Sequence, residues 1–454
     1  MKKIRQIFRN KVLILISLIA YRFSLDFLYV NEVAELWDYQ HFEFHRDNIA
    51  YIISILWFCI IAWRENRIVN QKQASSIFEF LLNLLFFIPF SSYIGLSGST
   101  TQFVFYSILY WLILTISFMY FRKNGKPKKK IYTNINVNDK GPIRVPSLFI
   151  KIAVPIVVIN FFSTIYYNGL SFNISFDEIY DIRLAAREIK MPTILSYLKP
   201  ISTPVLMILL IISIVNRKKL YTILLLFAQF ENFAFGALKG DLFIMLLAVC
   251  IALFYRTGRN YYFLYAILLL NVFAIIERSI IGVSTICTVF HRRMLFMPSL
   301  LTSEYFDFFS SNEVLYFRDS FMRHFVPSPY NAEVPRLIGD IYYGEPDKAC
   351  NTGIVGDDFA QLGWLALIAF PLLRGFTVKI LDNVSSRVNP KLVAYVCASY
   401  TLSFISSSFF SILLTRGFIV ICILLYIINK SNLKNSYGKF RINRCSRLHR
   451  TPPH

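Results

Sequence analysis

Hydrophobic stretches of a length suited to crossing a lipid bilayer run through this 454-residue chain from end to end, twelve in all. About 20 apolar residues in a helix span the ~30 Å hydrocarbon core, and lipid offers no water to an unpaired backbone. We therefore expect an all-α, polytopic integral membrane protein of about twelve transmembrane helices, forming one transmembrane domain over residues 1–454. The expected spans are 12–30, 49–63, 76–95, 102–121, 148–167, 200–216, 220–238, 241–255, 261–280, 357–378, 391–411 and 413–429.

Basic residues divide the connecting segments into two sets. By the positive-inside rule, the segments rich in Lys and Arg face the cytoplasm. One set holds 31 of the 48 Lys and Arg residues, whereas the first connection on the other side, 31–48, is acidic. Both termini, including the basic tail 430–454, are then expected in the cytoplasm. The basic segments are 1–11, 64–75, 122–147, 217–219, 256–260, 379–391 and 430–454.

The net charge of +21 follows from this division and does not indicate a nucleic-acid partner. The charges are scattered among short loops without an RNA- or DNA-binding motif. A cleavable signal peptide is not expected, because the first apolar run contains Arg22 and Asp26 and lacks a small-x-small cleavage site. The seven cysteines show no metal-binding spacing, and a disulfide between Cys287 and Cys350 is left open.

Two segments on the outer side are too long to be simple connectors, and long loops kept in a compact protein are usually functional. In the first, 168–199, Ser175 and Glu178 form a capping-box pattern that predicts the start of a helix. Arg183 and Arg187 then lie one turn apart on one face, a spacing that suits two guanidinium groups holding one anion. The alternative is that both arginines pair with neighbouring aspartates or with lipid headgroups.

The second long outer segment, 281–356, carries basic residues against the usual outward depletion. This pattern indicates an anionic ligand at the outer surface. Tyr305 belongs to an aromatic run that fits a helix at the membrane interface or over a cavity, where a sugar face stacks on a ring. Aromatic residues are also expected at the headgroup level without any ligand. The six basic residues are Arg292, Arg293, Arg318, Arg323, Arg336 and Lys348.

Further cations stand at the outer ends of predicted spans: Lys239 at a hairpin tip, Arg278 at the end of its span, and Arg416 at an outer turn. Charges at such places are costly and tend to be functional. The three residues come from separate parts of the sequence but from one membrane face, which favours convergence on a site. The alternative is that each snorkels to the interface. Glu231, in mid-span, needs a partner that the sequence does not identify.

Four motifs occur in order in the outer segments. They are Tyr180-Asp-Ile-Arg183, Arg292-Arg-x-x-x-x-Pro298, Tyr305-Phe-Asp-Phe-Phe-Ser310 and Asn351-Thr-Gly-x-x-x-Asp357-Asp-Phe-Ala-x-x-Gly363. Over about residues 170–420, their pattern and order resemble the oligosaccharide repeat-unit polymerases of bacterial envelopes, which make O-antigen, capsule and exopolysaccharide. The arginine-x10-glycine spacing of some members of that family is absent here.

The resemblance implies a glycosyltransferase at the outer face of the bacterial cytoplasmic membrane. Such an enzyme transfers a glycan chain from undecaprenyl pyrophosphate to a second lipid-linked repeat unit, so its donor and acceptor are both held in membrane lipid. It uses no nucleotide, cofactor or metal, and it works beside a flippase and a chain-length regulator. Its product is O-antigen of lipopolysaccharide, capsule or exopolysaccharide.

The departing pyrophosphate develops negative charge, which arginine forks neutralise strongly in a site of low dielectric. Arg292 and Arg293 are the candidate catalytic cations for this step. The acceptor hydroxyl must also lose a proton as it attacks the anomeric carbon. Candidate bases are His324, Asp357, Asp358 and His291, although the two aspartates equally suit a helix start. Candidate substrate-binding residues are Arg183, Arg187, Lys239, Arg278, Arg318, Arg323, Arg416 and Tyr305.

Two alternatives remain: another lipid-linked glycan transferase, and a non-enzymatic flippase or exporter. An O-antigen ligase shares the outer arginines and differs in its acceptor, whereas a metal-dependent transferase typically has an adjacent acidic pair in its first outer loop, which is missing here. A flippase or exporter of the same glycans should show paired halves and broken helices. The sequence contains no internal repeat that would indicate this architecture.

Overall fold

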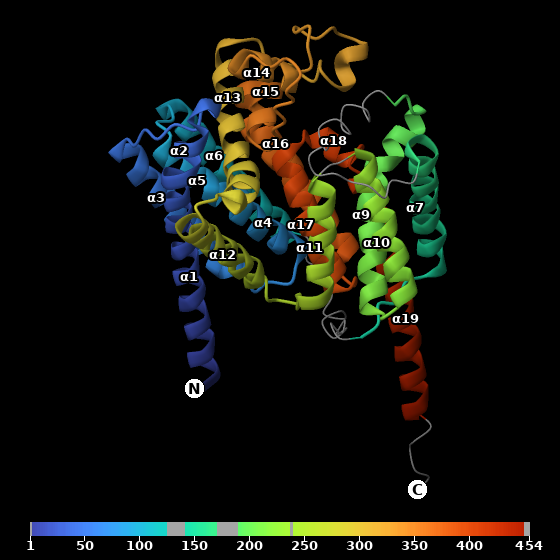
Figure 1. The fold of residues 1–454 in the computed structure, drawn as a ribbon. Coiled ribbons are helices and arrows are strands. Elements are labelled where there is room, and N and C mark those ends of the chain that lie inside the picture. The colour runs from blue at the N-terminus through green and yellow to red at the C-terminus, as the bar shows by residue number, and fades with distance from the viewer. Residues whose placement is uncertain (1, 125–140, 170–188, 237–238, 449–454) are drawn as a thin grey trace. The chain divides into compact units, whose positions relative to one another are not determined.

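The computed structural model describes the chain except for residues 1, 125–140, 170–188, 237–238 and 449–454 (Figure 1). Within the described ranges every regular element is a helix, and the one strand-like pairing is an isolated bridge between His45 and Ser97. The expected all-α fold is therefore confirmed for the described part of the chain.

Nine helical segments in the described ranges are long and apolar enough to cross a membrane, which makes this a multi-pass membrane protein. Three further expected spans coincide with helices outside that set: α10 (Lys219–Gly236), α11 (Lys239–Phe254) and α17 (Pro390–Ser406). The count of twelve spans stays a prediction. The nine segments are Lys11–Gln40, Asn48–Ile68, Ala74–Leu96, Thr101–Lys123, Ser147–Asn168, Thr193–Val215, Tyr261–Ile281, Gly356–Ser385 and Phe409–Leu433.

The chain folds into two compact units, each assembled from pieces distant in the sequence. Unit 1 consists of Met1–Asn124, Gly258–Lys379 and Thr401–Phe409. Unit 2 consists of Gly125–Thr257, Ile380–Tyr400 and Phe410–His454. Because neither unit is a continuous stretch, no change of composition along the chain marks the division between them.

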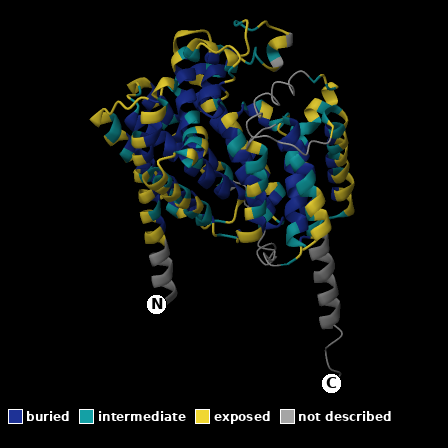
Figure 2. Cartoon of the chain, viewed as in Figure 1, coloured by how far each residue is buried: buried dark blue, intermediate teal, exposed yellow. Residues whose placement is uncertain are grey.

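The centre of unit 1 is the apolar segment 74–96. Nearly all of its residues are buried, as Figure 2 shows for the interior of the molecule, because a helix that is apolar on every side needs other helices around it. The helices α1 and α3 pack against its second half, and α6 packs against its first. The elements are α1 (Lys2–Leu28), α3 (Asn48–Ile68), α4 (Ala74–Leu82), η3 (Asn83–Phe87), α5 (Ile88–Leu96) and α6 (Thr101–Asn124).

The segment 281–356, expected to be an outer loop with short helices, is built into unit 1. The segment contains helices, as expected. Its helix α13 (Met297–Ser311) packs against α15 (Gly356–Leu362) and η6 (Cys287–Phe296), and most apolar side chains of α13 are buried. The ring centroid of Phe306 in α13 lies 4.5 Å from that of Phe359 in α15 and 5.3 Å from that of Tyr106. The elements are η6 (Cys287–Phe296), α13 (Met297–Ser311), η7 (Phe321–His324), α14 (Val334–Tyr343), α15 (Gly356–Leu362) and α16 (Ala366–Ser385).

Unit 2 is organised around α9 (Thr193–Val215), whose second half is almost wholly buried. It packs against α7 (Ser147–Asn168), α10 and α11, and α19 (Phe418–Leu448) touches both α7 and α9. Pro200 and Pro204 lie inside α9, a position that transmembrane helices tolerate because neighbouring groups satisfy the freed backbone.

Candidate functional site

Three π-helical segments lie close together in unit 1. They are η1 (Tyr29–Val33), which continues α1, η5 (Glu277–Ile281), which continues α12 (Tyr261–Ile276), and η6. The ring of Tyr29 in η1 lies 5.1 Å from that of Phe296 in η6. Such wide turns are rare and frequently mark functional sites. We call this region, residues 29–40 and 277–296, the π-helical junction.

Arg292 lies half-buried at the junction and is held without a counter-charge. Its Nη1 donates to Oε1 of Gln40 at 2.6 Å, and its guanidinium carbon lies 3.7 Å from the ring centroid of Trp37. Burial, together with the neighbouring charge of Arg293, lowers the pKa of the guanidinium. Among the described residues no carboxylate lies within ion-pair distance of Arg292, and its buried Nε has no hydrogen-bond partner.

Arg278 and Arg293 add two more cations to the junction. Arg293 is exposed, and Arg278 is partly exposed, with its Nη2 3.6 Å from the carboxylate of Glu35. Glu32 is buried beside them and interacts electrostatically with Arg278. The structure thus brings together three of the predicted site arginines. The disulfide that the sequence left open is not formed in the structure, where Cys287 of the junction and Cys350 are both free.

The acidic pair at the start of α15 is divided between two environments. Asp358 is fully buried and forms an ion pair with Arg374 of α16 at 2.6 Å, while the hydroxyl of Tyr110 donates to its Oδ2. Asp357 is also buried, and it interacts electrostatically with the carboxyl groups of Asp358 and Asp319. Asp358 is therefore committed to a structural pair, and Asp357 stays a predicted catalytic residue.

The remaining site residues predicted from segment 281–356 are not part of the π-helical junction. Arg318 donates to Glu313 at 2.6 Å and to the carbonyl oxygen of Leu315 at 2.9 Å. Arg323 is exposed in η7. His324 ends the same short helix, and its side chain lies outside the described part of the structure.

Tyr305 and His291 are core residues of unit 1. The Tyr305 ring is buried, and its hydroxyl donates to the carbonyl oxygen of Cys350 at 2.9 Å, so no ring face is open to a sugar. His291 is fully buried, with its Nε2 2.8 Å from Oδ1 of Asn271. Burial lowers the pKa of His291 to about 4, so the ring is neutral near pH 7.

The other predicted cations belong to unit 2 or lie outside the described residues. Arg416 is exposed, and Asp241 interacts electrostatically with it and with Lys199. The ammonium of Lys199 lies 3.4 Å from the ring centroid of Phe235. Lys239 begins α11, and its side chain is not described. Arg183 and Arg187 fall within 170–188, outside the described residues, so their role stays a prediction.

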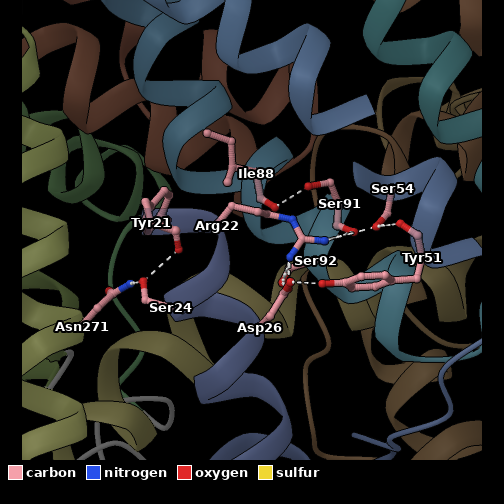
Figure 3. A network of polar contacts seen from close by, with 10 residues as sticks. All are labelled: Tyr21, Arg22, Ser24, Asp26, Tyr51, Ser54, Ile88, Ser91, Ser92 and Asn271. Atoms are coloured by element: carbon pink, nitrogen blue, oxygen red, sulfur yellow. Dashed lines mark hydrogen bonds and ion pairs between the residues drawn. The ribbon is translucent and has the colours of Figure 1, made fainter. Parts of the chain in front are cut away.

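Arg22 and Asp26, which the sequence marks only as charges in the first apolar run, are the centre of a polar network in the structure (Figure 3). They form an ion pair within α1, and Ser92 of α5 contacts both. The Arg22 guanidinium also donates to Ser54 at 3.1 Å, and the Tyr51 hydroxyl donates to Asp26 at 3.0 Å. The only sequence signal for this network is that two opposite charges stand four residues apart in a membrane span.

Glu304, which directly precedes the aromatic run of α13, was not among the predicted site residues. Its residue surface is only 4% exposed, and its Oε1 accepts a hydrogen bond from the Tyr343 hydroxyl at 2.8 Å. Burial raises the pKa of the Glu304 carboxyl to about 7. Nothing in the sequence distinguishes Glu304 from the nearby Asp307, and only the structure shows that Glu304 is the buried one of the two.

In the part of the chain that the structure describes, no three His, Cys, Asp or Glu side chains come together as metal ligands would. The independence from metal therefore stays a prediction for experiment. No protein-family model, curated protein or solved structure matches the chain. The site is accordingly interpreted from its own chemistry.

Proposed function

We propose that this protein is a membrane glycosyltransferase that polymerises oligosaccharide repeat units linked to undecaprenyl pyrophosphate. The observation that carries the proposal is Arg292, a partly desolvated guanidinium with a neutral amide and an aromatic ring as its neighbours and no carboxylate at ion-pair distance among the described residues. A cation in this condition is suited to receive an anion from outside the protein, because its charge is not already neutralised.

The proposed reaction uses the junction as a receptor for the leaving group. Arg292 and the exposed Arg293 bind the diphosphate, and Arg278 adds charge beside them. As the bond from the anomeric carbon to the phosphate oxygen breaks, negative charge accumulates on the diphosphate. Preorganised cations stabilise that charge more in the transition state than in the ground state, which is what accelerates the transfer.

The proposal includes an orientation. Both termini lie in the cytoplasm of a bacterium, and the junction lies at the outer face of its cytoplasmic membrane. A single cysteine introduced at the exposed residue Asn312, in a chain whose native cysteines are replaced, should react with a membrane-impermeant thiol reagent added to intact cells. Protection of that cysteine until the membrane is opened would place segment 281–356 on the wrong side for this reaction.

The activity is tested with the natural substrate. Cells that lack this chain should accumulate single lipid-linked repeat units on the outer leaflet, and lipid extracts of those cells supply donor and acceptor together. The purified full-length chain in detergent or vesicles should convert this extract into a ladder of longer lipid-linked glycans, and an excess of chelator should leave the ladder unchanged. Single units that stay unconverted would overturn the proposal, and loss of the ladder in chelator would indicate a metal-dependent transferase.

One observation favours a second candidate, a flippase or exporter of the same glycans. Charged side chains are buried within membrane spans, in the Arg22–Asp26 and Arg374–Asp358 pairs, as is often seen along transport pathways. Both pairs are neutral overall, so they do not present a net charge to a passing glycan. Accumulation of single repeat units on the inner leaflet in cells lacking the chain would favour this candidate over the polymerase.

A further inference from the structure

Two carboxylate–tyrosine hydrogen bonds join α13 to α14 in unit 1. Oε1 of Glu304 accepts from the Tyr343 hydroxyl at 2.8 Å, and Oδ2 of Asp307 accepts from the Tyr342 hydroxyl at 2.6 Å. The two pairs lie on the same two helices and have the same chemistry. They differ in burial, because Glu304 is 4% exposed whereas Asp307 is exposed. The second pair is therefore a natural control for the first.

Only half of the Glu304 carboxyl is used within the described structure. Tyr343 holds Oε1, whereas Oε2 is buried without a hydrogen-bond partner among the described residues. A buried acceptor left unpaired is costly, and native proteins usually satisfy it with a water, an ion or a ligand group. Burial also raises the pKa of this carboxyl to about 7, the value at which a side chain exchanges protons most effectively near neutral pH.

The Glu304 carboxyl is linked through Tyr343 to the residues that hold Arg292. Gln40 accepts the hydrogen bond from Arg292, and the ring of the next residue, His41, lies 5.2 Å from the ring of Tyr343. The dipeptide Gln40–His41 thus contacts both the arginine and the tyrosine that orients Glu304. Tyr343 and Lys348, which cover this region, are only half-buried, and the ammonium of Lys348 lies 3.5 Å from the Tyr343 ring centroid.

The other ionisable groups near the junction differ from Glu304 in how they are held. Asp358 is paired with Arg374, and His291 is neutral within the core. Glu32 is buried and interacts electrostatically with Arg278, whose ion-pair partner is Glu35. Both Glu32 oxygens lack a hydrogen-bond partner among the described residues, so Glu32 lacks the tyrosine hydrogen bond that orients Glu304. Glu304 combines a fixed orientation, through Tyr343, with an oxygen that no described residue uses.

We propose that Glu304 is the general base of the transfer, accepting on Oε2 the proton of the acceptor hydroxyl. This inference rests on the proposed function. The acceptor oxygen forms a bond to the anomeric carbon of the donor glycan, and the bond from that carbon to the phosphate oxygen breaks. The electron pair leaves on the diphosphate, which Arg292 and Arg293 receive, and the proton passes to Glu304 and then to water.

The test compares Glu304→Gln with Asp307→Asn in the purified full-length chain. The glutamine keeps an oxygen to accept from Tyr343, so the fold is retained and only the base is lost. The wild-type ladder rate should rise with pH through about 7, because the base must be ionised. Glu304→Gln should lower the rate by about 10²–10⁴-fold and abolish this rise, with the KM for the lipid-linked units unchanged. Asp307→Asn should keep both the rate and the pH profile.

A substrate-free measurement tests the physical premise separately. Infrared difference spectra of the wild-type protein should contain a protonated-carboxyl band that disappears as the pH rises through about 7, and Glu304→Gln should lack it.

A rescue experiment with substrate tests the same assignment. Formate or azide should partly restore the ladder rate of Glu304→Ala by acting as an external base.

The outcomes separate the two proposals. A wild-type chain that forms no ladder overturns the polymerase. A wild-type ladder together with an unchanged rate and profile in Glu304→Gln overturns the base assignment alone. The assignment is also overturned if Glu32→Gln flattens the profile while Glu304→Gln does not, or if the infrared band survives in Glu304→Gln.

Discussion

Arg374 and Arg292, both in unit 1, are held in opposite ways. Arg374 is fully buried, and its Nη2 lies 2.6 and 2.8 Å from the two oxygens of Asp358. Arg292 is half-buried and has a neutral amide in place of a carboxylate. Each has an aromatic neighbour, Phe404 at 5.0 Å from Arg374 and Trp37 at 3.7 Å from Arg292. The difference between them is therefore the counter-charge, not the presence of aromatic packing.

This difference separates a structural charge from a candidate functional one. A buried arginine that already has its carboxylate can fix helices together but has little attraction left for an external anion. An arginine oriented by neutral groups keeps its full charge, and an anionic ligand is the partner that completes it. The comparison predicts that changes at Arg374 act on stability and that changes at Arg292 act on catalysis.

The largest expected effect is on the stability of unit 1. Asp358→Ala leaves Arg374 charged and unpaired in the interior, so it should lower the free energy of unfolding by about 3–5 kcal/mol. The double variant Asp358→Leu/Arg374→Met removes both charges and should recover most of that loss. Thermal unfolding of the purified chain in detergent measures both. Equal stability of the wild type and Asp358→Ala would mean that the buried pair is not a structural link.

The next effect is on the rate at the junction. Arg292→Ala should slow ladder formation by about 10²–10³-fold, because a preorganised donor to the departing charge is lost. Its unfolding temperature should stay close to the wild-type value, since no ion pair is broken among the described residues. The control is Arg292→Lys, which keeps the charge but loses the planar fork and its stacking on Trp37, so its rate should be intermediate. A normal rate in Arg292→Ala would remove the junction from the mechanism.

His291 directly precedes Arg292 in the sequence. It should make the stability of the protein depend on pH, without affecting the binding of substrate. Its pKa is about 4 in the folded protein against an ordinary value of 6.5. Between these values the unfolded chain binds a proton that the folded chain does not, so stability falls as the pH falls, by about 1.4 kcal/mol per pH unit. His291→Gln should lack this slope in unfolding experiments from pH 7 to pH 4. An unchanged slope in the variant would assign it to other groups.

The membrane architecture followed from the sequence because apolar length is a direct requirement of the bilayer. The segment 281–356 was harder to predict. Its polar residues suggested an exposed loop, but the spacing of apolar residues in α13 buries Leu300, Tyr305 and Phe309 on helical faces that pack into unit 1. A helix that inserts among spans without being long enough to cross the membrane resembles a loop when only hydropathy is considered.

The candidate site could be predicted only where its residues carried a local signal. Arg292 and Arg293 were predicted because adjacent arginines are unusual in an outward segment. Arg374 was not singled out because its partners, Asp358 and Tyr110, lie 16 and 264 residues away in the chain. Glu304 was missed for the same reason, since Tyr343 is 39 residues further on. Long-range pairing decides which charges are satisfied, and it leaves no pattern in the sequence near either partner.

The smallest expected effect is at Arg318, a predicted substrate-binding residue that resembles Arg374 more than Arg292. It already has a carboxylate, that of Glu313 at 2.6 Å, and it also donates to two carbonyl oxygens of its own turn. Because Glu313 is exposed, Arg318→Ala should cost about 1 kcal/mol or less in unfolding free energy and leave the ladder rate unchanged. A loss of rate comparable to that of Arg292→Ala would show that a satisfied arginine can still bind the substrate. The presence or absence of a counter-charge would then no longer distinguish the two kinds of arginine.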